Sequence, residues 1–336
     1  MKKNSVELRM ELKAVSPIAI IENNVNEPNG NIVTKVKRTA VVVKDENGED
    51  RVTEVGYLPA NGIRGNLRRL ATKKLVQAVK ENEGITELKD SDLHAMLSGS
   101  GASHSALTVA QANEVREKNP ILSVFGTGLL LQGKLKMSDA RPKVDEKSWQ
   151  LIKRFSFVKV DDVLMGTKYA NLFSKEQIEN WEKSVADNSE ARRKDRENKK
   201  LAKESGEVFD ESTKTKKSSI QHFAQKEYIA SQTKFFSCFS IENATELEVG
   251  MLLHSLKDFV DLGRVGSSQN IGFGVVDIKI TDEDDTISIE RVADEEYIFS
   301  AKKDMSLTGD FKKAYDAYEA FLKTATRDNI EIISKF

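Results

Sequence analysis

The sequence has little of several features that identify major protein classes. Its 336 residues include a single cysteine, Cys238, which excludes an internal disulfide and a Cys-x-x-Cys metal site and fits a reducing cytoplasm. No apolar run approaches the ~20 residues that a membrane helix needs. The first residues, MKKNSVELRMEL, lack the apolar centre of a signal peptide. These absences predict a cytoplasmic protein.

The chain also lacks an excess of charge of either sign. Its 52 lysines and arginines are balanced by 53 aspartates and glutamates, so the formal net charge is −1. The protein as a whole is therefore no polycation, and any binding of nucleic acid must come from a local basic patch. The length allows one large domain or two modest ones.

Signatures of metal and nucleotide sites are missing as well. The four histidines, His94, His104, His222 and His254, lack metal-ligand spacing. We expect all four to be solvated, His254 because it lies on the polar side of its predicted helix. No lysine follows a glycine-rich segment as in a Walker motif, and no Gly-x-Ser-x-Gly elbow is present. We predict no bound metal and no cofactor.

What is present is a series of strands and helices that alternate along the chain. Hydrophobic periodicity predicts the following elements: a strand over 6–15, a hairpin over 32–59, helices over 61–81 and 90–97, strands over 128–140, 154–160 and 227–241, a helix over 246–262 that ends at Gly263, a strand over 275–280, and a helix over 308–324. This order predicts an α+β fold in which helices cover one face of an antiparallel sheet.

The first candidate site lies where a strand turns into a helix, in YLPANGIRGNLRRL, residues 57–70. Free N–H groups point outward at the start of a helix. Arg64 and Arg68 are one turn apart, and Gly65 costs a helix roughly 1 kcal/mol relative to alanine. A ligand contact explains this glycine, although a solvated basic face explains the arginines equally well. The candidate residues are Asn61, Gly62, Arg64, Gly65, Asn66, Arg68 and Arg69.

The second candidate site is the glycine-rich loop GRVGSSQNIGFG, residues 263–274. It runs from a helix to a strand, which is the reverse of a dinucleotide-binding fingerprint. A long turn that needs positive φ explains Gly263 and Gly266. It explains less well the small polar side chains, which suit a phosphate or a ribose. The candidate residues are Gly263, Arg264, Gly266, Ser267, Ser268, Gln269 and Asn270.

Four segments, in this order, resemble the RAMP superfamily (repeat-associated mysterious proteins), specifically the Cas-seven-type backbone subunits of CRISPR effector complexes. They are YLPANGIRGNLRRL, SVFGTGLLLQGKLKMSDA, KEYIASQTKFFSCFSI and LGRVGSSQNIGFGVVDI. The resemblance implies an antiviral ribonucleoprotein in which copies of the chain stack along a guide RNA (crRNA), form a helical filament with other effector subunits, and present the guide for pairing with target nucleic acid. The two candidate sites would then hold guide-RNA phosphates.

The resemblance also implies a division of the chain. We expect a modified RRM-like, or ferredoxin-like, palm built from an antiparallel sheet, with a helical insertion and a protruding thumb. The thumb corresponds to a charged insertion that could not pack in a core. The expected parts are 1–85, the first half of the palm; 86–120, a helical finger; 121–161, palm strands; 162–225, the thumb-like insertion; 226–282, the second half of the palm; and 283–336, a C-terminal helical tail.

One departure from the family concerns catalysis. RNA-cleaving type III members carry an acidic residue, usually aspartate, in the loop after the first strand. Here that loop, SPIAIIENNVNEPNGN, offers only Glu22 and Glu27, and Asn61 replaces the serine of the signature. This favours the type IV branch and a subunit that is not an enzyme, with no catalytic residue. The alternatives are a backbone subunit that also cleaves target RNA, and a small-molecule enzyme that uses the glycine-rich loop.

Overall fold

The structure is a computed structural model. It describes residues 5–26, 32–99, 107–128, 130–145, 147–160, 174–177, 179–180, 183 and 221–335. The chain divides into two compact units. Unit 1 contains Met1–Asn23, Lys35–Lys153 and Glu227–Phe336, and unit 2 contains Asn24–Thr34 and Arg154–Lys226.

The described strands of unit 1 include a seven-stranded sheet whose centre is the N-terminal strand. Its order is β13–β12–β11–β1–β10–β6, and the short β7 also pairs with β10. All of these pairings are antiparallel. The bounds are β1 Ser5–Ala14, β6 Leu135–Met137, β7 Arg141–Pro142, β10 Lys234–Glu242, β11 Val276–Thr281, β12 Ile287–Ala293 and β13 Ala301–Leu307.

The alternation along β1 explains how the sheet acquires an inner and an outer face. Leu8, Met10 and Leu12 are buried, Glu7 and Arg9 are exposed, and Glu11 is half-buried. Successive side chains of a strand point to opposite faces, so this pattern turns the apolar side toward the helices. The predicted first strand is therefore confirmed.

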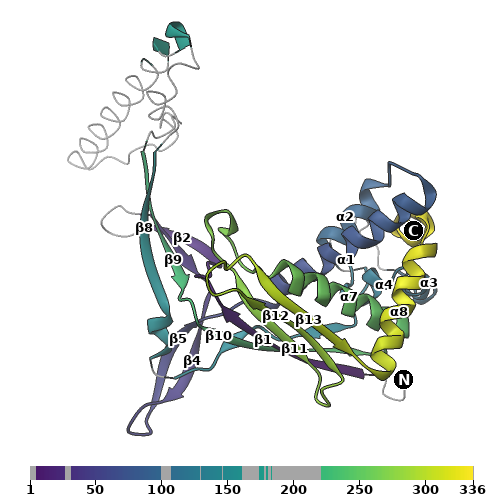
Figure 1. Cartoon of the computed structure of the whole chain (residues 1–336), viewed down its shortest axis with the longest axis horizontal. Helices are drawn as coiled ribbons and strands as arrows, with labels where there is room; N and C mark the ends of the chain where they lie inside the picture. Colours follow the sequence, from purple (N-terminus) through teal and green to yellow (C-terminus); the bar gives the residue numbers. More distant parts are fainter. Residues whose placement is uncertain are drawn as a thin grey trace. The chain divides into compact units, whose positions relative to one another are not determined.

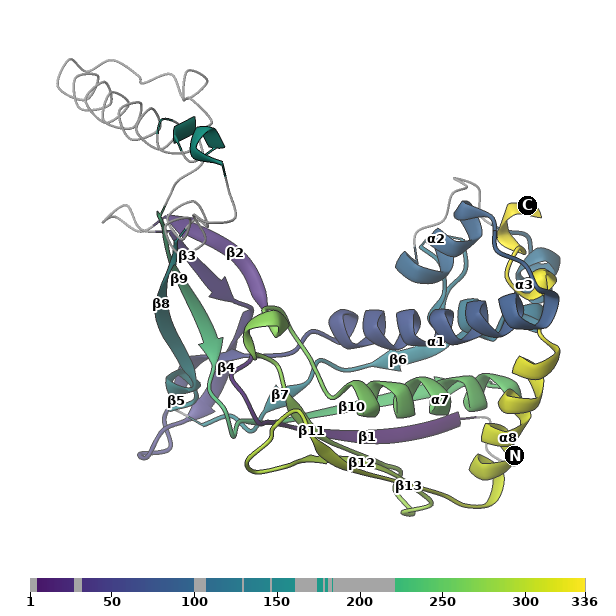
Figure 2. The same cartoon turned by 45° about the horizontal axis from the view of Figure 1, so that its top comes forward.

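Helices α1 and α7 lie along one face of this sheet and run in opposite directions, so α1 begins at the end of the layer where α7 stops (Figures 1 and 2). None of the described helices is long and apolar enough to cross a membrane. The helical bounds are α1 Ala60–Glu83, α2 Asp90–Ser98, α3 Val109–Lys118, α4 Pro120–Phe125, α7 Glu246–Leu262 and α8 Gly309–Thr324, with short 3-10 turns η1 Ser148–Leu151, η5 Gln269–Ile271, η6 Arg327–Asn329 and η7 Ile333–Lys335.

The ends of α7 follow directly from local sequence. The hydroxyl of Thr245 caps the helix by accepting from the backbone N–H of Glu248. The carboxylate of Glu248 in turn accepts from the backbone N–H of Thr245. Gly263 ends the helix with φ +58°, the left-handed conformation that glycine adopts without cost. The predicted helices over 61–81, 90–97, 246–262 and 308–324 are all confirmed.

The predicted strand over 128–140 is mostly wrong. Only Leu135–Met137 is a strand, and the helix α4 lies immediately before this segment. Gly126, with φ +73°, ends α4, and a tight turn closes with the N–H of Leu130 donating to the carbonyl of Thr127. Short apolar runs fit a buried turn as well as a strand, so periodicity alone could not distinguish them.

The segment predicted as a helical tail, 283–336, contains α8 but also two strands. β12 and β13 extend the sheet beyond β11, with Ile289 opposite Met305 and Ile280 opposite Ile289. The alternation of apolar and polar residues over 287–290 is the signal for β12 that sequence reasoning did not use. The described fold is nevertheless α+β, and its largest sheet is antiparallel, as predicted.

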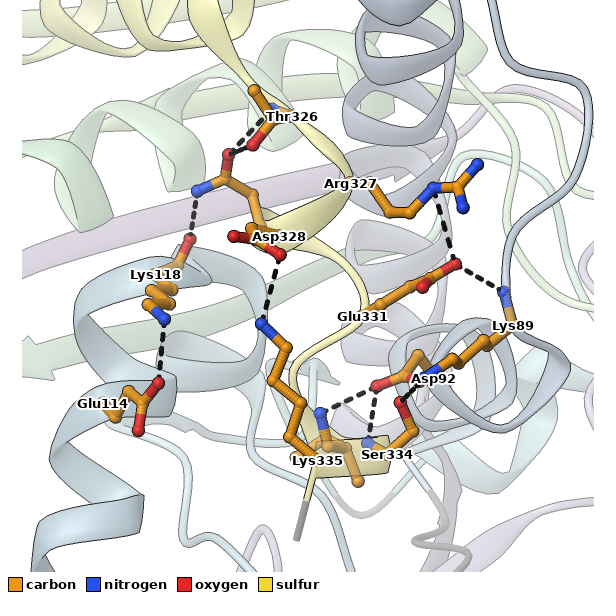
Figure 3. Close-up of polar contacts among 12 residues, drawn as sticks. Lys89, Asp92, Glu114, Lys118, Thr326, Arg327, Asp328, Glu331, Ser334 and Lys335 are labelled. Carbon is orange, nitrogen blue, oxygen red and sulfur yellow. Dashed lines mark hydrogen bonds and ion pairs between the residues drawn. The ribbon is translucent and has the colours of Figure 1, made fainter.

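The last residues of unit 1, 326–335, form what we call the C-terminal clasp (Figure 3). The buried carboxylate of Asp92 on α2 accepts from the backbone N–H groups of Ile333, at 2.7 Å, and Ser334, at 3.0 Å. The side chain of Asn329 donates to the carbonyl of Lys118 on α3. The clasp thus joins α2 and α3 to the end of the chain.

The predicted hairpin is confirmed as β4 (Arg38–Lys44) and β5 (Asp50–Gly56), paired with Val42 opposite Val52. Residues 32–36, predicted as part of its first strand, form a separate strand, β3.

Unit 2 holds most of a four-stranded sheet with the order β2–β3–β9–β8, in which β3 pairs with β9 in parallel. These strands are β2 Ile21–Asn26, β3 Ile32–Val36, β8 Ile152–Val160 and β9 Gln221–Ile229. Most of the predicted thumb, 162–225, lies outside the described residues, as does His104.

The prediction that His254 is solvated is wrong. Its side chain is 3% exposed, stacks on Tyr315 with ring centroids 3.7 Å apart, and lies 3.2 Å from the Nζ of Lys74. Burial, followed by the charge of Lys74, lowers the pKa of His254 to about 4. The helical wheel places His254 on the polar side, but α8 covers that side, which the wheel could not show.

This burial makes stability depend on pH. The unfolded chain takes up a proton on His254 as the pH falls below its ordinary pKa of 6.5, whereas the folded chain does so only near 4. The free energy of unfolding is expected to fall between pH 6.5 and about pH 5, by up to about 2 kcal/mol from this group. Urea unfolding of His254→Phe, which keeps a stacked ring, should show a shallower pH dependence than the wild type. Parallel curves would contradict the assignment.

Candidate nucleic-acid interface

The junction between strand and helix is anchored by the Ser-Asp-Ala segment. Leu58 and Ala140 exchange two backbone hydrogen bonds of 2.9 Å. The N–H of Ala60, at the first turn of α1, donates to the Asp139 carboxylate at 2.8 Å. A carboxylate at a helix start satisfies a free N–H and favours the helix dipole. The fold therefore brings together two of the four segments on which the family resemblance rests.

Two arginines of α1 reach the carbonyl end of the short helix α4. Arg64 donates to the carbonyl of Phe125. Arg68 donates to the carbonyls of Phe125, at 2.7 Å, and Gly126, at 3.0 Å, and its guanidinium lies 5.7 Å from the centroid of the Phe125 ring. The last carbonyls of a helix lack partners within the helix, and cations are favoured there. Arg69, in contrast, is exposed and donates to the side-chain oxygen of Asn66.

The charge of this cluster is not balanced. Burial lowers the pKa of Arg64. Burial, with the charges of Arg64 and Arg69, lowers the pKa of Arg68 to about 10. No described carboxylate contributes to either shift. Arginine side chains keep their charge in proteins, so the cluster forms a local positive patch on a chain with almost no net charge.

These arginines line a pocket of about 490 Å³, which we call the arginine pocket. Its walls come from three places: the first turns of α1, the end of α2 at Leu97–Gly99, and the loop that follows α4. Five of the seven residues predicted for the first candidate site line it: Asn61, Arg64, Gly65, Arg68 and Arg69. The other two do not; Gly62 has open space around it, and Asn66 contacts Arg69.

Sequence reasoning missed the glycines that let the guanidinium groups approach the walls. A Cβ on Gly99 would lie 1.5 Å from Nη1 of Arg68, and one on Gly133 would lie 2.7 Å from Nη2 of Arg64. Both distances are far too short for a real side chain. Gly65, which the sequence singled out, is not required in this way, because its Cβ would meet only the flexible Arg69 guanidinium, at 3.3 Å.

The late glycine-rich loop is held in place by the segment that follows β1. Gly266 has φ +76°, and a Cβ there would lie 2.5 Å from the carbonyl oxygen of Ala19. The N–H and the hydroxyl of Ser267 both donate to that same carbonyl, at 2.7 Å and 3.0 Å. A Cβ on Gly263 would lie 2.1 Å from the Nε of Arg291. Gly263 and Gly266 therefore have structural reasons for being glycine.

The polar residues of this loop also contact one another. Arg264 donates to the carbonyl of Gln269 and lies 4.7 Å from the centroid of the Phe299 ring. The side chain of Gln269 donates to the carbonyl of Gly266, whereas Asn270 is exposed. Ser268 has φ +63°. The loop follows α7, so it lies at the end of the helical layer where α1 begins (Figure 2). Its hydrogen bonds to the carbonyl of Ala19 join it to the segment that follows β1.

The outer face of the large sheet offers little for base stacking. Its central strands, β1 and β11, contain no aromatic residue. Arg9, Glu11 and Lys279 line a depression of about 500 Å³ there, together with Phe236, which is 38% exposed, and the free thiol of Cys238. Modules that read single-stranded RNA on a sheet use several exposed aromatic side chains. The arginine pocket is therefore the better candidate interface.

Comparison with known proteins shows the family of this chain. The family model of the RAMP superfamily matches residues 11–277. The chain belongs to the RAMP superfamily. It is also similar to a solved structure entitled "Type IV-B CRISPR Complex", with a TM-score of 0.48 and 15% sequence identity over 82% of this chain and 90% of that chain. No curated protein matches the sequence. Within the described residues of this RAMP protein, no cluster of histidine, cysteine and acidic side chains could hold a metal ion.

Proposed function

We propose that this RAMP protein is a guide-RNA-binding backbone subunit of a CRISPR effector ribonucleoprotein, of the Cas-seven type and close to the type IV branch. Copies bind along the crRNA, contact other effector subunits, and present the guide for pairing with the target. The observation that carries the proposal is the arginine pocket, in which two segments of the family pattern place three cations together without a carboxylate. Base pairing would supply sequence specificity, while the protein binds phosphate and shape.

The order of strands supports a palm of the RRM or ferredoxin type. The chain order is β1, α1, β6, β10, α7 and β11, and the sheet order of these strands is β11–β1–β10–β6. A β-α-β-β-α-β unit of this kind places both helices on one face. The helices α2, α3 and α4 are inserted between α1 and β6, and the predicted finger, 86–120, contains α2 and α3. The domain boundaries and the thumb at 162–225 remain predictions.

Binding of RNA tests the proposal. We expect Arg64→Ala combined with Arg69→Ala to weaken binding roughly tenfold or more for every guide sequence, and to reduce the slope of log K against log salt by about 1.4, because two phosphate contacts to a single strand are lost. Arg68 is left in place, since its removal would leave the buried carbonyls of Phe125 and Gly126 without donors. Filter binding over a salt series measures both effects.

The matched control is Lys80→Ala, which removes an exposed charge farther along α1 and should change the slope little. Guide-sized RNA that copurifies with the wild type and not with the double variant would support the proposal further. A nucleic-acid-free wild type with no salt-dependent affinity for RNA would contradict it.

We also propose that the subunit does not cleave the target. Of the two acidic residues in the loop after the first strand, Glu22 is exposed on β2, and Glu27 lies outside the described residues. Complementary RNA is expected to remain intact and bound after incubation of the complex with Mg²⁺, as gel electrophoresis would show. Regularly spaced products that disappear in Glu22→Ala or Glu27→Ala would instead establish the nuclease alternative, because a glutamate can act as a general base.

A further inference from the structure

The floor of the arginine pocket carries charge that nothing in the described protein neutralises. Arg68 is only 9% exposed, and the residues that line the pocket include no aspartate or glutamate. A buried cation without a counterion is costly, by several kcal/mol for an isolated ion. Here the carbonyls of Phe125 and Gly126 offset part of that cost. An anion seated in the pocket would offset the rest.

A second feature points to a ligand independently of the charge. Thr127 lines the pocket and is fully buried, yet its Oγ1 has no hydrogen-bond partner among the described residues. The Nε of Arg64 is likewise buried without a partner. Buried polar atoms are almost always hydrogen-bonded, so two unpartnered donors at one site call for an explanation. Hydroxyl and guanidinium N–H groups are donors that phosphate oxygens accept from.

The donors are also held in fixed orientations. The carbonyl of Phe125 accepts from both Arg64 and Arg68, and the glycines at 99 and 133 let these guanidinium groups lie directly against the walls. A guanidinium fixed on one edge presents its remaining N–H groups as a planar fork, which matches the oxygens of a phosphate. A pocket of about 490 Å³ is within the range of small-ligand sites.

We propose that the floor of the arginine pocket, formed by Arg64, Arg68 and Thr127, binds a phosphomonoester in preference to a phosphodiester. The ligand is the doubly charged phosphate of a nucleoside monophosphate or of the end of a nucleic-acid strand. A diester brings one negative charge and leaves most of the positive charge of the pocket uncompensated, whereas a monoester above its second pKa of about 6 brings nearly two. The exposed Arg69 at the rim remains available to a strand that continues past the pocket.

The direct test compares three ligands that share one nucleoside. Adenosine 5′-monophosphate carries a monoester, cyclic 3′,5′-adenosine monophosphate carries a diester, and adenosine carries no phosphate. In calorimetric titrations of the full chain at about pH 7.5, where the monoester is doubly charged, we expect the monoester to bind roughly tenfold or more tightly than the diester, and adenosine not to bind. Equal affinities for monoester and diester would overturn the proposal.

Two variants locate the binding. Thr127→Val removes the unpartnered hydroxyl at nearly constant volume and should weaken binding of adenosine 5′-monophosphate roughly tenfold, as expected for one hydrogen bond to a charged group. Arg64→Gln should weaken it similarly, and the carbonyl of Phe125 keeps its hydrogen bond from Arg68 in that variant. Arg9→Gln removes the same charge from the outer face of the sheet and should leave it unchanged. Wild-type affinity in Thr127→Val, measured on protein with the wild-type melting temperature, would place the ligand elsewhere.

Competition distinguishes the two sources of the monoester. Displacement of adenosine 5′-monophosphate by a short oligoribonucleotide with a terminal phosphate, but not by the same strand with hydroxyl ends, identifies a strand end. Failure of both strands to displace it identifies a free mononucleotide. These titrations use no guide, so they remain informative if the protein proves not to bind guide RNA, and guide binding can persist if the monoester preference is absent.

Discussion

Gly250→Ala is expected to lower the free energy of unfolding by about 3 kcal/mol, at the upper end of the effects of overpacking. Gly250 lies in α7 and packs directly against α8. A Cβ at this position would lie 2.0 Å from the carbonyl oxygen of Ala314 and 2.9 Å from the Cβ of Tyr318. The first of these atoms belongs to the backbone of α8, so no side-chain rotation can relieve the clash and the two helices must separate.

The matched control makes the same substitution at a glycine of another helix. Gly62 is in the first turn of α1, and a Cβ there would have nothing within 4 Å. Gly62→Ala is therefore expected to be neutral or to stabilise the protein by up to about 1 kcal/mol, through the higher helix propensity of alanine. Urea denaturation of the two variants should thus move the midpoint in opposite directions. A Gly250→Ala protein as stable as the wild type would show that α8 does not pack at this distance.

Asp92→Ala is expected to destabilise the protein by about 3 kcal/mol and to weaken RNA binding as well. The carboxylate is fully buried and accepts from the N–H groups of Ile333 and Ser334 in the C-terminal clasp (Figure 3). Its removal leaves both donors without a partner in or near the core, at a cost of roughly 1–3 kcal/mol for each. Melting temperature and filter binding measure the two effects.

The effect on binding follows from the position of α2. The carbonyl of Met96 in this helix accepts from Thr72 of α1, and the residues after it, Leu97–Gly99, form one wall of the arginine pocket. Loosening the clasp therefore loosens that wall. Asp92→Asn is the conservative control, because its amide oxygen can still accept both hydrogen bonds and should retain most of the affinity. Equal RNA binding by wild type and Asp92→Ala, each fully folded, would show that the clasp does not affect RNA binding.

Local sequence was sufficient wherever an element is defined by its own pattern. The alternation along β1 identifies a strand with one buried face, and the apolar spacing in 246–262 with Gly263 behind it identifies α7. These patterns could be interpreted because apolar side chains recur with a different period in strands than in helices. In addition, few residues other than glycine adopt positive φ at a helix end. The choice of residues 57–70 as a site rested on similar local features.

Patterns could not show which partner a side chain would meet. Arg64 and Arg68 look like a basic face that is open to solvent, yet both donate to the end of α4, a helix that the sequence analysis did not predict. His254 looks solvated and is buried under α8. Gly99, Gly133 and Thr127, which complete the arginine pocket, belong to segments far from α1 in sequence, so no local periodicity connects them to it.

The amino-acid sequence by itself determined the α+β class, most of the helices, the first strand and the family to which four ordered segments point. Each of these depends on residues that are neighbours along the chain. Only the tertiary structure decided that the start of α1, the end of α2 and the loop after α4 enclose one pocket, and that its cations face no described carboxylate. The reason is physical: charge balance and close approach depend on distances between segments, and these distances exist only once the chain has folded.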